Sequence, residues 1–131
     1  MFFLLLACVS KGGPGTLVST DYGWYLPFGS PNTDEAWGIA QDSASGDLLV
    51  ATHQGAPRML PDLYVYRITA DGEVLWQMHW GEADAELAYI VTLADGVVYV
   101  GGQVYQNSLD TQSSDALVLA LDAETGTPQW V

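Results

Sequence analysis

The sequence predicts an all-β protein in which one four-stranded antiparallel unit occurs twice. Trp24, Trp76 and Trp130 recur at separations of 52 and 54 residues, and the sequence around them recurs too. Apolar runs of about four to eight residues are bounded by Gly-containing turns, which is typical of short antiparallel strands. A period of about 50 residues made of such runs indicates a repeat whose units bury their faces against one another.

The two copies of the unit align at four separate landmarks. Each copy places a glycine five residues after its tryptophan, and each continues with an acidic stretch and an apolar run. Matching of this length and register favours a true internal duplication. The matched segments are 24–29 with 76–81, 34–39 with 86–90, 46–51 with 96–101, and 62–72 with 115–126, the last with one inserted residue.

Each unit is predicted to contain four strands joined in sequence order. Glycine marks the tight turns, because it adopts a positive φ without a Cβ clash. A further strand at about 22–28 is expected to be the last strand of a preceding unit. The predicted strands are 36–41, 47–53, 62–69 and 73–80 in the first unit, and 87–93, 97–103, 115–121 and 127–131 in the second.

The burial pattern follows the order of the strands. The first three strands of each unit are almost continuously apolar, which is typical of a sheet covered on both faces. The fourth strand alternates, as expected at the outer edge of a sheet with one wet face. Residues 83–90 could form a helix, but the matching segment contains Pro31, so we expect a loop that leads into the strand. In the fourth strand, one side is predicted to carry Val74, Trp76, Met78 and Trp80, and the other side Glu73, Leu75, Gln77 and His79.

The segments 62–81 and 115–130 resemble the bacterial β-propeller repeat family, whose units run Asp-x-x-Val-x-x-Leu, then a Gly turn, then Trp and Gly. Residues 121–130 also resemble the tryptophan-docking motif of the quinoprotein-like propellers. The resemblance covers residues 16–131 and implies two propeller-type blades. The first blade, with the preceding strand, spans about 22–80, and the second spans 81–131. Such motifs are specific for the fold rather than for a function.

Two blades do not make a closed ring, because propellers contain about 4–8 of them. We therefore expect an incomplete β-propeller. A truncated reading frame or a fragment of a longer protein is the preferred explanation, and self-association of several chains into a ring is the alternative.

The N-terminal residues resemble a bacterial secretory leader. Residues 1–8 form an apolar run too short to span a bilayer, and they end in a lipobox-like sequence at Cys8, the only cysteine. We expect Cys8 to carry a lipid and residues 9–15 to form a Gly-rich tether. This predicts a location at the cell envelope, either on the outer membrane or facing the periplasm or exterior.

The charge of the chain is strongly negative. Three Lys and Arg residues stand against sixteen Asp and Glu residues, which gives a net charge of -13. Such a chain repels phosphate backbones and anionic membrane surfaces. Nucleic acid is therefore excluded as a partner, and membrane contact is expected only through the lipid anchor. The simplest interpretation of the acidic surface is that it keeps the protein solvated.

No catalytic motif stands out in the sequence. His53 and His79 are 26 residues apart without zinc-ligand spacing, and no Gly-x-Ser-x-Gly nucleophile motif occurs. We expect His53, which follows the second strand, to be a solvated loop histidine. The sequence therefore predicts no catalytic residues and no metal ligands.

The longer connections offer the best candidates for binding. The segments 29–35, 53–61, 81–86 and 104–114 are expected to share one rim of the sheets, where binding residues usually lie. Calcium is a low-ranked ligand, for which Asn107, Asp110 and Asp115 could supply oxygens. A solvated acidic rim is favoured over a calcium site. The candidate rim residues are Asp34, Glu35, His53, Arg58, Asp110 and Asp115.

Two functions follow from these expectations. The preferred hypothesis is a non-catalytic, lipid-anchored propeller protein that acts as a scaffold or interaction module for a protein or polysaccharide partner. The alternative is a piece of a quinoprotein-like enzyme with pyrroloquinoline quinone on the propeller axis. That enzyme needs cationic groups around its cofactor, and Lys11, Arg58 and Arg67 are the only Lys and Arg residues in the chain.

Overall fold

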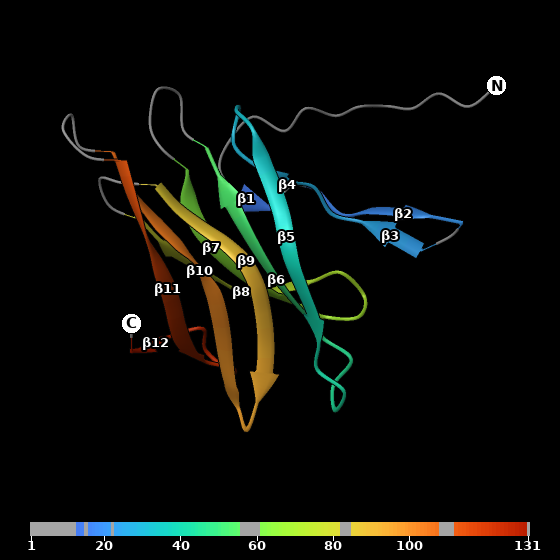
Figure 1. The fold of residues 1–131 in the computed structure, drawn as a ribbon. Coiled ribbons are helices and arrows are strands. Elements are labelled where there is room, and N and C mark those ends of the chain that lie inside the picture. The colour runs from blue at the N-terminus through green and yellow to red at the C-terminus, as the bar shows by residue number, and fades with distance from the viewer. Residues whose placement is uncertain are drawn as a thin grey trace.

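The computed structural model describes residues 13–14, 16–21, 23–55, 61–81, 85–107 and 112–130. Within these ranges the protein is all-β and contains no helix. Two four-stranded antiparallel sheets make up most of the molecule, and each is joined in sequence order (Figure 1). The predicted all-β class and the two four-stranded antiparallel sheets are therefore confirmed.

The first sheet has the order β5-β6-β7-β8 and the second the order β12-β11-β10-β9. Most strand ends lie within two residues of their predicted positions. The strands of the first sheet are β5 (Asp34–Gln41), β6 (Leu48–Gln54), β7 (Asp62–Ile68) and β8 (Val74–Trp80). Those of the second are β9 (Ala85–Ala94), β10 (Val97–Asn107), β11 (Gln112–Asp122) and β12 (Pro128–Trp130).

The connection between β10 and β11 differs from its prediction. The ladder between these strands continues to the pair Asn107 and Gln112, so most of the expected loop at 104–114 is strand. The prediction of a long loop there was wrong. Polar residues at the end of this hairpin suggested a loop, yet a two-stranded ladder satisfies their backbone groups equally well.

Four short strands precede the first sheet. The strands β1 (Gly13–Pro14) and β4 (Phe28–Gly29) pair with each other, as do β2 (Val18–Thr20) and β3 (Gly23–Tyr25). The single strand predicted at 22–28 is thus divided between β3 and β4. Pro27 lies at the division, where its missing N–H would have left a gap in a continuous ladder.

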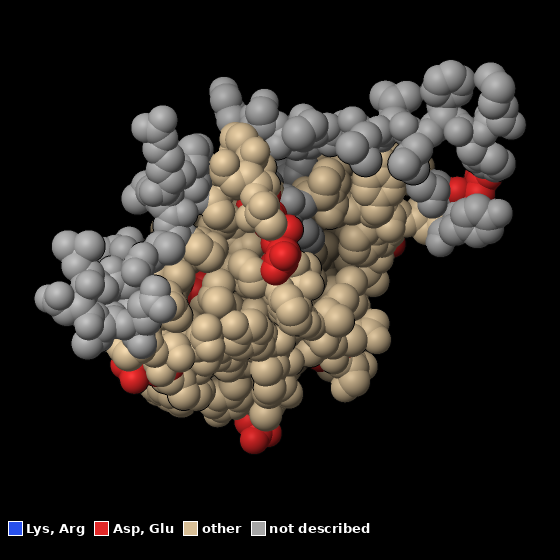
Figure 2. Space-filling model, turned by 45° about the horizontal axis from the view of Figure 1, so that its top comes forward, with Lys and Arg blue, Asp and Glu red and all other residues tan. Residues whose placement is uncertain are grey.

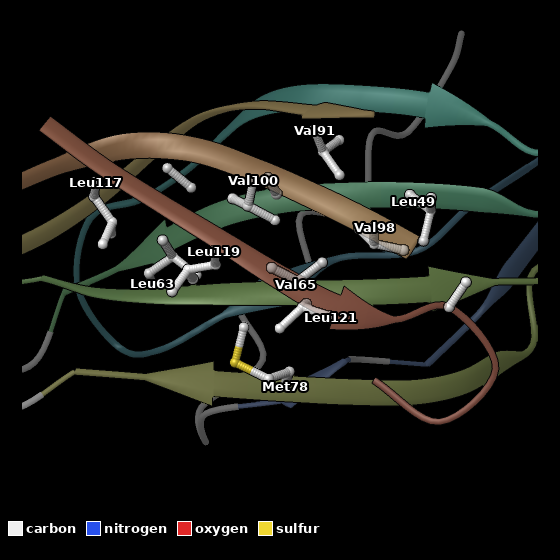
Figure 3. Close-up of a cluster of buried hydrophobic side chains, with 13 residues drawn as sticks. Leu49, Leu63, Val65, Met78, Val91, Val98, Val100, Leu117, Leu119 and Leu121 are labelled. Carbon is white, nitrogen blue, oxygen red and sulfur yellow. The ribbon is translucent and has the colours of Figure 1, made fainter. Parts of the chain in front are cut away.

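The two large sheets pack face to face over a common core. Figure 3 shows Leu117, Leu119 and Leu121 of β11 lying across from side chains of β7 and β8. A smaller cluster of Val50 and Tyr66 with neighbouring apolar residues covers the opposite face of the first sheet. The middle strands β6 and β7 are therefore buried on both faces, as predicted, whereas β5 leaves Trp37 and Ile39 exposed, so the prediction was wrong for that strand.

Bulges occur at corresponding places in the two sheets. Trp37 in β5 and Tyr89 in β9 are each left out of the ladder to the next strand. The ladder between β7 and β8 likewise skips Leu75, which moves Val74 to the opposite face from Trp76. Val74 packs in the smaller cluster, so the prediction that it shares a side with Trp76 was wrong. A bulge adds one residue and reverses the alternation beyond it.

Two tryptophans make the same contact with successive turns. The indole N–H of Trp24 donates to the carbonyl of Ala70 at 2.8 Å, and that of Trp76 donates to the carbonyl of Ala123 at 3.0 Å. Each ring lies on a glycine of the turn before the fourth strand: a Cβ added at Gly126 would meet Trp76 Cε3 at 2.7 Å. At Gly72, an added Cβ would meet Trp24 Cδ2 at 3.1 Å.

Within the described ranges there is no helix of the length and apolarity needed to cross a membrane.

Candidate binding site where β5 and β9 meet

The edge strands β5 and β9 come together between the two sheets (Figure 1). A Cβ added at Gly38 in β5 would lie 3.0 Å from the backbone Cα of Ile90 in β9. Any side chain at this position would push the strands apart, because a backbone cannot move aside as a flexible side chain can. Gly38 therefore sets the close approach of the two edge strands.

The two bulges place aromatic rings at this junction. The rings of Trp37 and Tyr89 meet edge to face, with centroids 5.8 Å apart and planes at 87°. This is a favourable geometry for an aromatic pair. Trp37 nevertheless keeps 59% of its surface exposed, and Tyr89 keeps 36%. Large aromatic side chains left this open are candidates for contact with a ligand or partner.

A carboxylate completes the arrangement. Glu35 and His53 are direct partners on β5 and β6, and Oε2 of Glu35 is 3.1 Å from Nε2 of His53. The same oxygen accepts the indole N–H of Trp37 at 3.0 Å. These four residues, Glu35, Trp37, His53 and Tyr89, are called the aromatic edge cluster below.

Hydrogen bonding keeps Glu35 ionised. The indole N–H of Trp37, followed by His53, lowers the pKa of the Glu35 carboxyl below its usual range. Both hydrogen bonds go to Oε2, so Oε1 accepts no hydrogen bond from the described part of the chain. The side chain of Glu35 is 47% exposed, which leaves a charged acceptor facing the solvent beside an open indole ring.

His53 is buried in β6, where it is 8% exposed, so its prediction as a solvated loop histidine was wrong. Its ring stacks against Trp37 with centroids 6.3 Å apart, and its Nε2 faces Glu35. Its Nδ1 is buried and has no hydrogen-bond partner among the described residues. The carboxylate of Glu35 accepts, so Nε2 is the donor in this contact. In this arrangement His53 positions the carboxylate of Glu35 and packs against the indole of Trp37.

The side chain of Asp34 lies on the opposite face of the first sheet from that of Glu35, because successive side chains of a strand alternate between its two faces. Its carboxylate accepts the backbone N–H of Ser30 at 2.7 Å and the Ser30 hydroxyl at 2.9 Å. It lines a cavity of about 210 Å³ together with Thr52 and Gln54. Gln54 donates to the hydroxyl of Tyr66 at 2.6 Å, and burial raises the pKa of Tyr66 to about 12.

The remaining predicted rim residues do not join the aromatic edge cluster. Asp115 is an exposed residue of β11 paired with Val104, and β10 separates β11 from β9. Arg58, Asp110 and the lipidation candidate Cys8 lie outside the described residues. Among those described, no group of three or more His, Cys, Asp or Glu is placed to hold a metal ion. The calcium hypothesis at Asn107, Asp110 and Asp115 stays a prediction.

A larger cavity lies at the other end of the sheets, beside the tight turns. It has a volume of about 700 Å³ and is lined by residues of both sheets, Arg67 among them. Arg67 donates to Asp47 and Asp42 at 2.9 Å each and to the carbonyl of Ala123 at 2.7 Å. Its guanidinium therefore ties the first sheet to the second and has little capacity left for a ligand.

Sequence reasoning found Glu35 and His53 but missed Trp37 and Tyr89. The signal for the two aromatics was present, since they occupy corresponding positions in the duplicated segment, 52 residues apart. The two bulges were not predicted. Each of them takes one of these aromatic residues out of the regular alternation of side chains along its strand. Arg67 was overlooked as a link between the sheets because its partners are 20, 25 and 56 residues away.

The charged side chains visible on one face of the molecule are acidic (Figure 2). Figure 2 shows acidic side chains at several places on a mostly uncharged face, with no Lys or Arg visible among its described residues.

Neither a scan against protein-family models nor a search of curated proteins finds a match to this chain.

Proposed function

We propose that the chain is a non-catalytic interaction module built from β-propeller-type blades and held at the bacterial cell envelope through a lipid on Cys8. The observation that carries this proposal is the tryptophan contact. Twice, a tryptophan on a strand donates its indole N–H to a turn of the four-stranded sheet that follows in the chain. A contact that passes from unit to unit is what stacked blades need, because each blade relies on its neighbours for burial.

The meeting of β5 and β9 supports the same proposal. In a propeller, the first strand of every blade lies nearest the axis, and these strands approach each other most closely. Gly38 allows such an approach here. A complete ring would take its other blades from the same protein or from further copies of this chain, since about 4–8 blades are needed.

The chemistry of the aromatic edge cluster favours binding over catalysis. Both ring nitrogens of His53 are occupied or buried, and Glu35 is ionised and exposed. An exposed carboxylate with a lowered pKa is a poor proton donor at neutral pH. Open aromatic rings beside it offer contact area, which is what an interaction module requires.

Reconstitution with pyrroloquinoline quinone and Ca²⁺ tests the non-catalytic part of this proposal. The purified protein is expected to give no redox-active visible spectrum. Among the described residues the one Lys or Arg is Arg67, and its guanidinium is already hydrogen-bonded within the protein. A quinoprotein spectrum that titrates with the added quinone would overturn the proposal in favour of an enzyme.

Fatty-acid labelling tests the anchor. The full chain, expressed in a Gram-negative bacterium fed an alkyne-tagged fatty acid, is expected to take up the label and to fractionate with membranes. Cys8→Ser should remove the label and release the protein. Label that persists in Cys8→Ser, or a parent protein that never takes it up, would contradict a lipid at this position.

A further inference from the structure

We propose that the aromatic edge cluster binds a cationic, N–H-donating side chain of a protein partner, of the kind that arginine carries. This inference deepens the proposed function and rests on it, since it names the chemistry by which the interaction module recognises its partner. The juxtaposition that points to it is an ionised carboxylate with one available oxygen beside an open indole ring.

The geometry suits a planar cation. Oε2 of Glu35 is taken by Trp37 and His53, so Oε1 remains to accept an N–H from outside. The indole of Trp37, 59% exposed, lies next to this carboxylate. A guanidinium donates to a carboxylate in its own plane and can lay its face on an aromatic ring at the same time. Both contacts are offered within one cluster.

The cluster is held in place before any partner arrives. Trp37 stacks on His53 at 6.3 Å, meets Tyr89 at 5.8 Å and donates to Glu35 at 3.0 Å. These three contacts restrict the ring although much of it faces the solvent. A partner would therefore lose little binding free energy to ordering the site.

The charge of the protein selects the sign of the ligand. With a net charge of -13, the chain attracts cations and repels anions. Among the described residues, Arg67 is the one Lys or Arg. Its guanidinium is held by two aspartates, so it does not compete for Glu35. A neutral saccharide could stack on Trp37, but it would make no use of the charge that the cluster maintains on Glu35.

Nuclear magnetic resonance titration of the full chain provides the test. The probe is N-acetyl-arginine amide, and its control is N-acetyl-citrulline amide, which has the same shape without the charge. We expect the Trp37 indole resonance to shift with the arginine probe, and citrulline to bind at least about fivefold more weakly. Added salt should weaken the arginine shift, because a half-exposed ion pair is screened.

Matched variants separate the site from the general acidity of the surface. Glu35→Gln and Glu73→Gln remove the same charge, but Glu73 is exposed on the chain before β8, away from Trp37 in sequence and ladder. We expect Glu35→Gln to abolish the shift and Glu73→Gln to preserve it. Trp37→Leu lacks the indole reporter, so binding is followed there by the backbone amides of Glu35 and Tyr89. These should stay unshifted with the arginine probe while the amide spectrum keeps its folded dispersion.

The outcomes that would overturn the inference are distinct. Equal shifts with arginine and citrulline, or equal losses in the two glutamine variants, would show contact without recognition of charge. A Trp37 shift with cellotriose but not with the arginine probe would assign the cluster to saccharides. Any of these results, with Cys8 still labelled and no quinone spectrum, would leave the proposed function standing.

Discussion

Trp37 and Glu35 show how one hydrogen bond gives an exposed residue a defined chemistry. The indole N–H is the largest cause of the lowered pKa of Glu35, ahead of His53. A carboxylate that receives donors in its ionised form releases its proton at lower pH. The free energy that this adds to folding is present at neutral pH and is lost as the pH falls through the folded-state pKa.

Trp37→Phe is expected to raise the pKa of Glu35 toward its usual value, because phenylalanine keeps the ring but lacks the N–H. The carboxyl resonance of Glu35, followed against pH, measures this change. Tyr89→Phe is the control, since it alters the neighbouring ring without removing a donor to Glu35. An unchanged pKa in Trp37→Phe would mean that His53 alone holds the carboxylate.

Tyr66 predicts a loss of stability at high pH. Burial raises its pKa to about 12, whereas a tyrosine in the unfolded chain has a pKa of about 10. Between these values the unfolded chain releases a proton that the folded chain keeps, so stability falls as the pH rises. The urea midpoint should drop as the pH is raised from about 9 to about 11, and drop less in Tyr66→Phe. Tyr25→Phe, at an exposed position, should behave like the parent.

Turns and bulges decide how the strands fit together. Gly126 adopts a φ of +72° and lies under the ring of Trp76, so it needs both an unusual backbone and an empty space above it. Gly96 adopts a similar φ of +77°, and a Cβ added there would have no described atom within 4 Å. The two glycines therefore share a backbone requirement and differ in the contact with tryptophan.

Gly126→Ala is expected to destabilise the protein more than Gly96→Ala. The left-handed backbone costs about 1–2 kcal/mol in either variant. The overlap with Trp76 should add about 1–3 kcal/mol at Gly126 alone. Denaturant unfolding of both variants measures the difference. Equal losses would show that the ring of Trp76 accommodates a methyl group at Gly126 without cost.

The packing of the two sheets leaves one face of the second sheet open. Val65 in β7 and Val118 in β11 occupy corresponding positions, 53 residues apart. Val65 is fully buried between the sheets, whereas Val118 is 49% exposed. Trp130, the counterpart of Trp76, lies on β12 opposite Ala120 of β11 and is 51% exposed. A face that one copy of the unit buries is thus presented to the solvent by the other.

Val65→Ser should cost about 2–4 kcal/mol, because it leaves a cavity and buries a hydroxyl. Val118→Ser should stay within about 0.5 kcal/mol in the monomer. Chemical denaturation at low protein concentration compares the two. Similar costs would mean that the open face is covered in solution.

The open face is expected to drive self-association, as exposed apolar patches and strand edges do. Light scattering should give a mass that rises with concentration, and a Val118→Ser, Trp130→Ser variant should shift it toward the monomer. A parent protein that remains monomeric at all concentrations would contradict this expectation.

Local patterns were sufficient to predict most strand ends of the two large sheets, and only the packing of the sheets assembled the candidate site. Short apolar runs and glycine turns act within a few residues, so β5 to β9 lie close to their expected ranges. The cluster of Glu35, Trp37 and Tyr89 depends on two bulges and on the approach at Gly38. Those features join residues about 50 positions apart in the chain, and no local propensity encodes which distant strand will lie alongside.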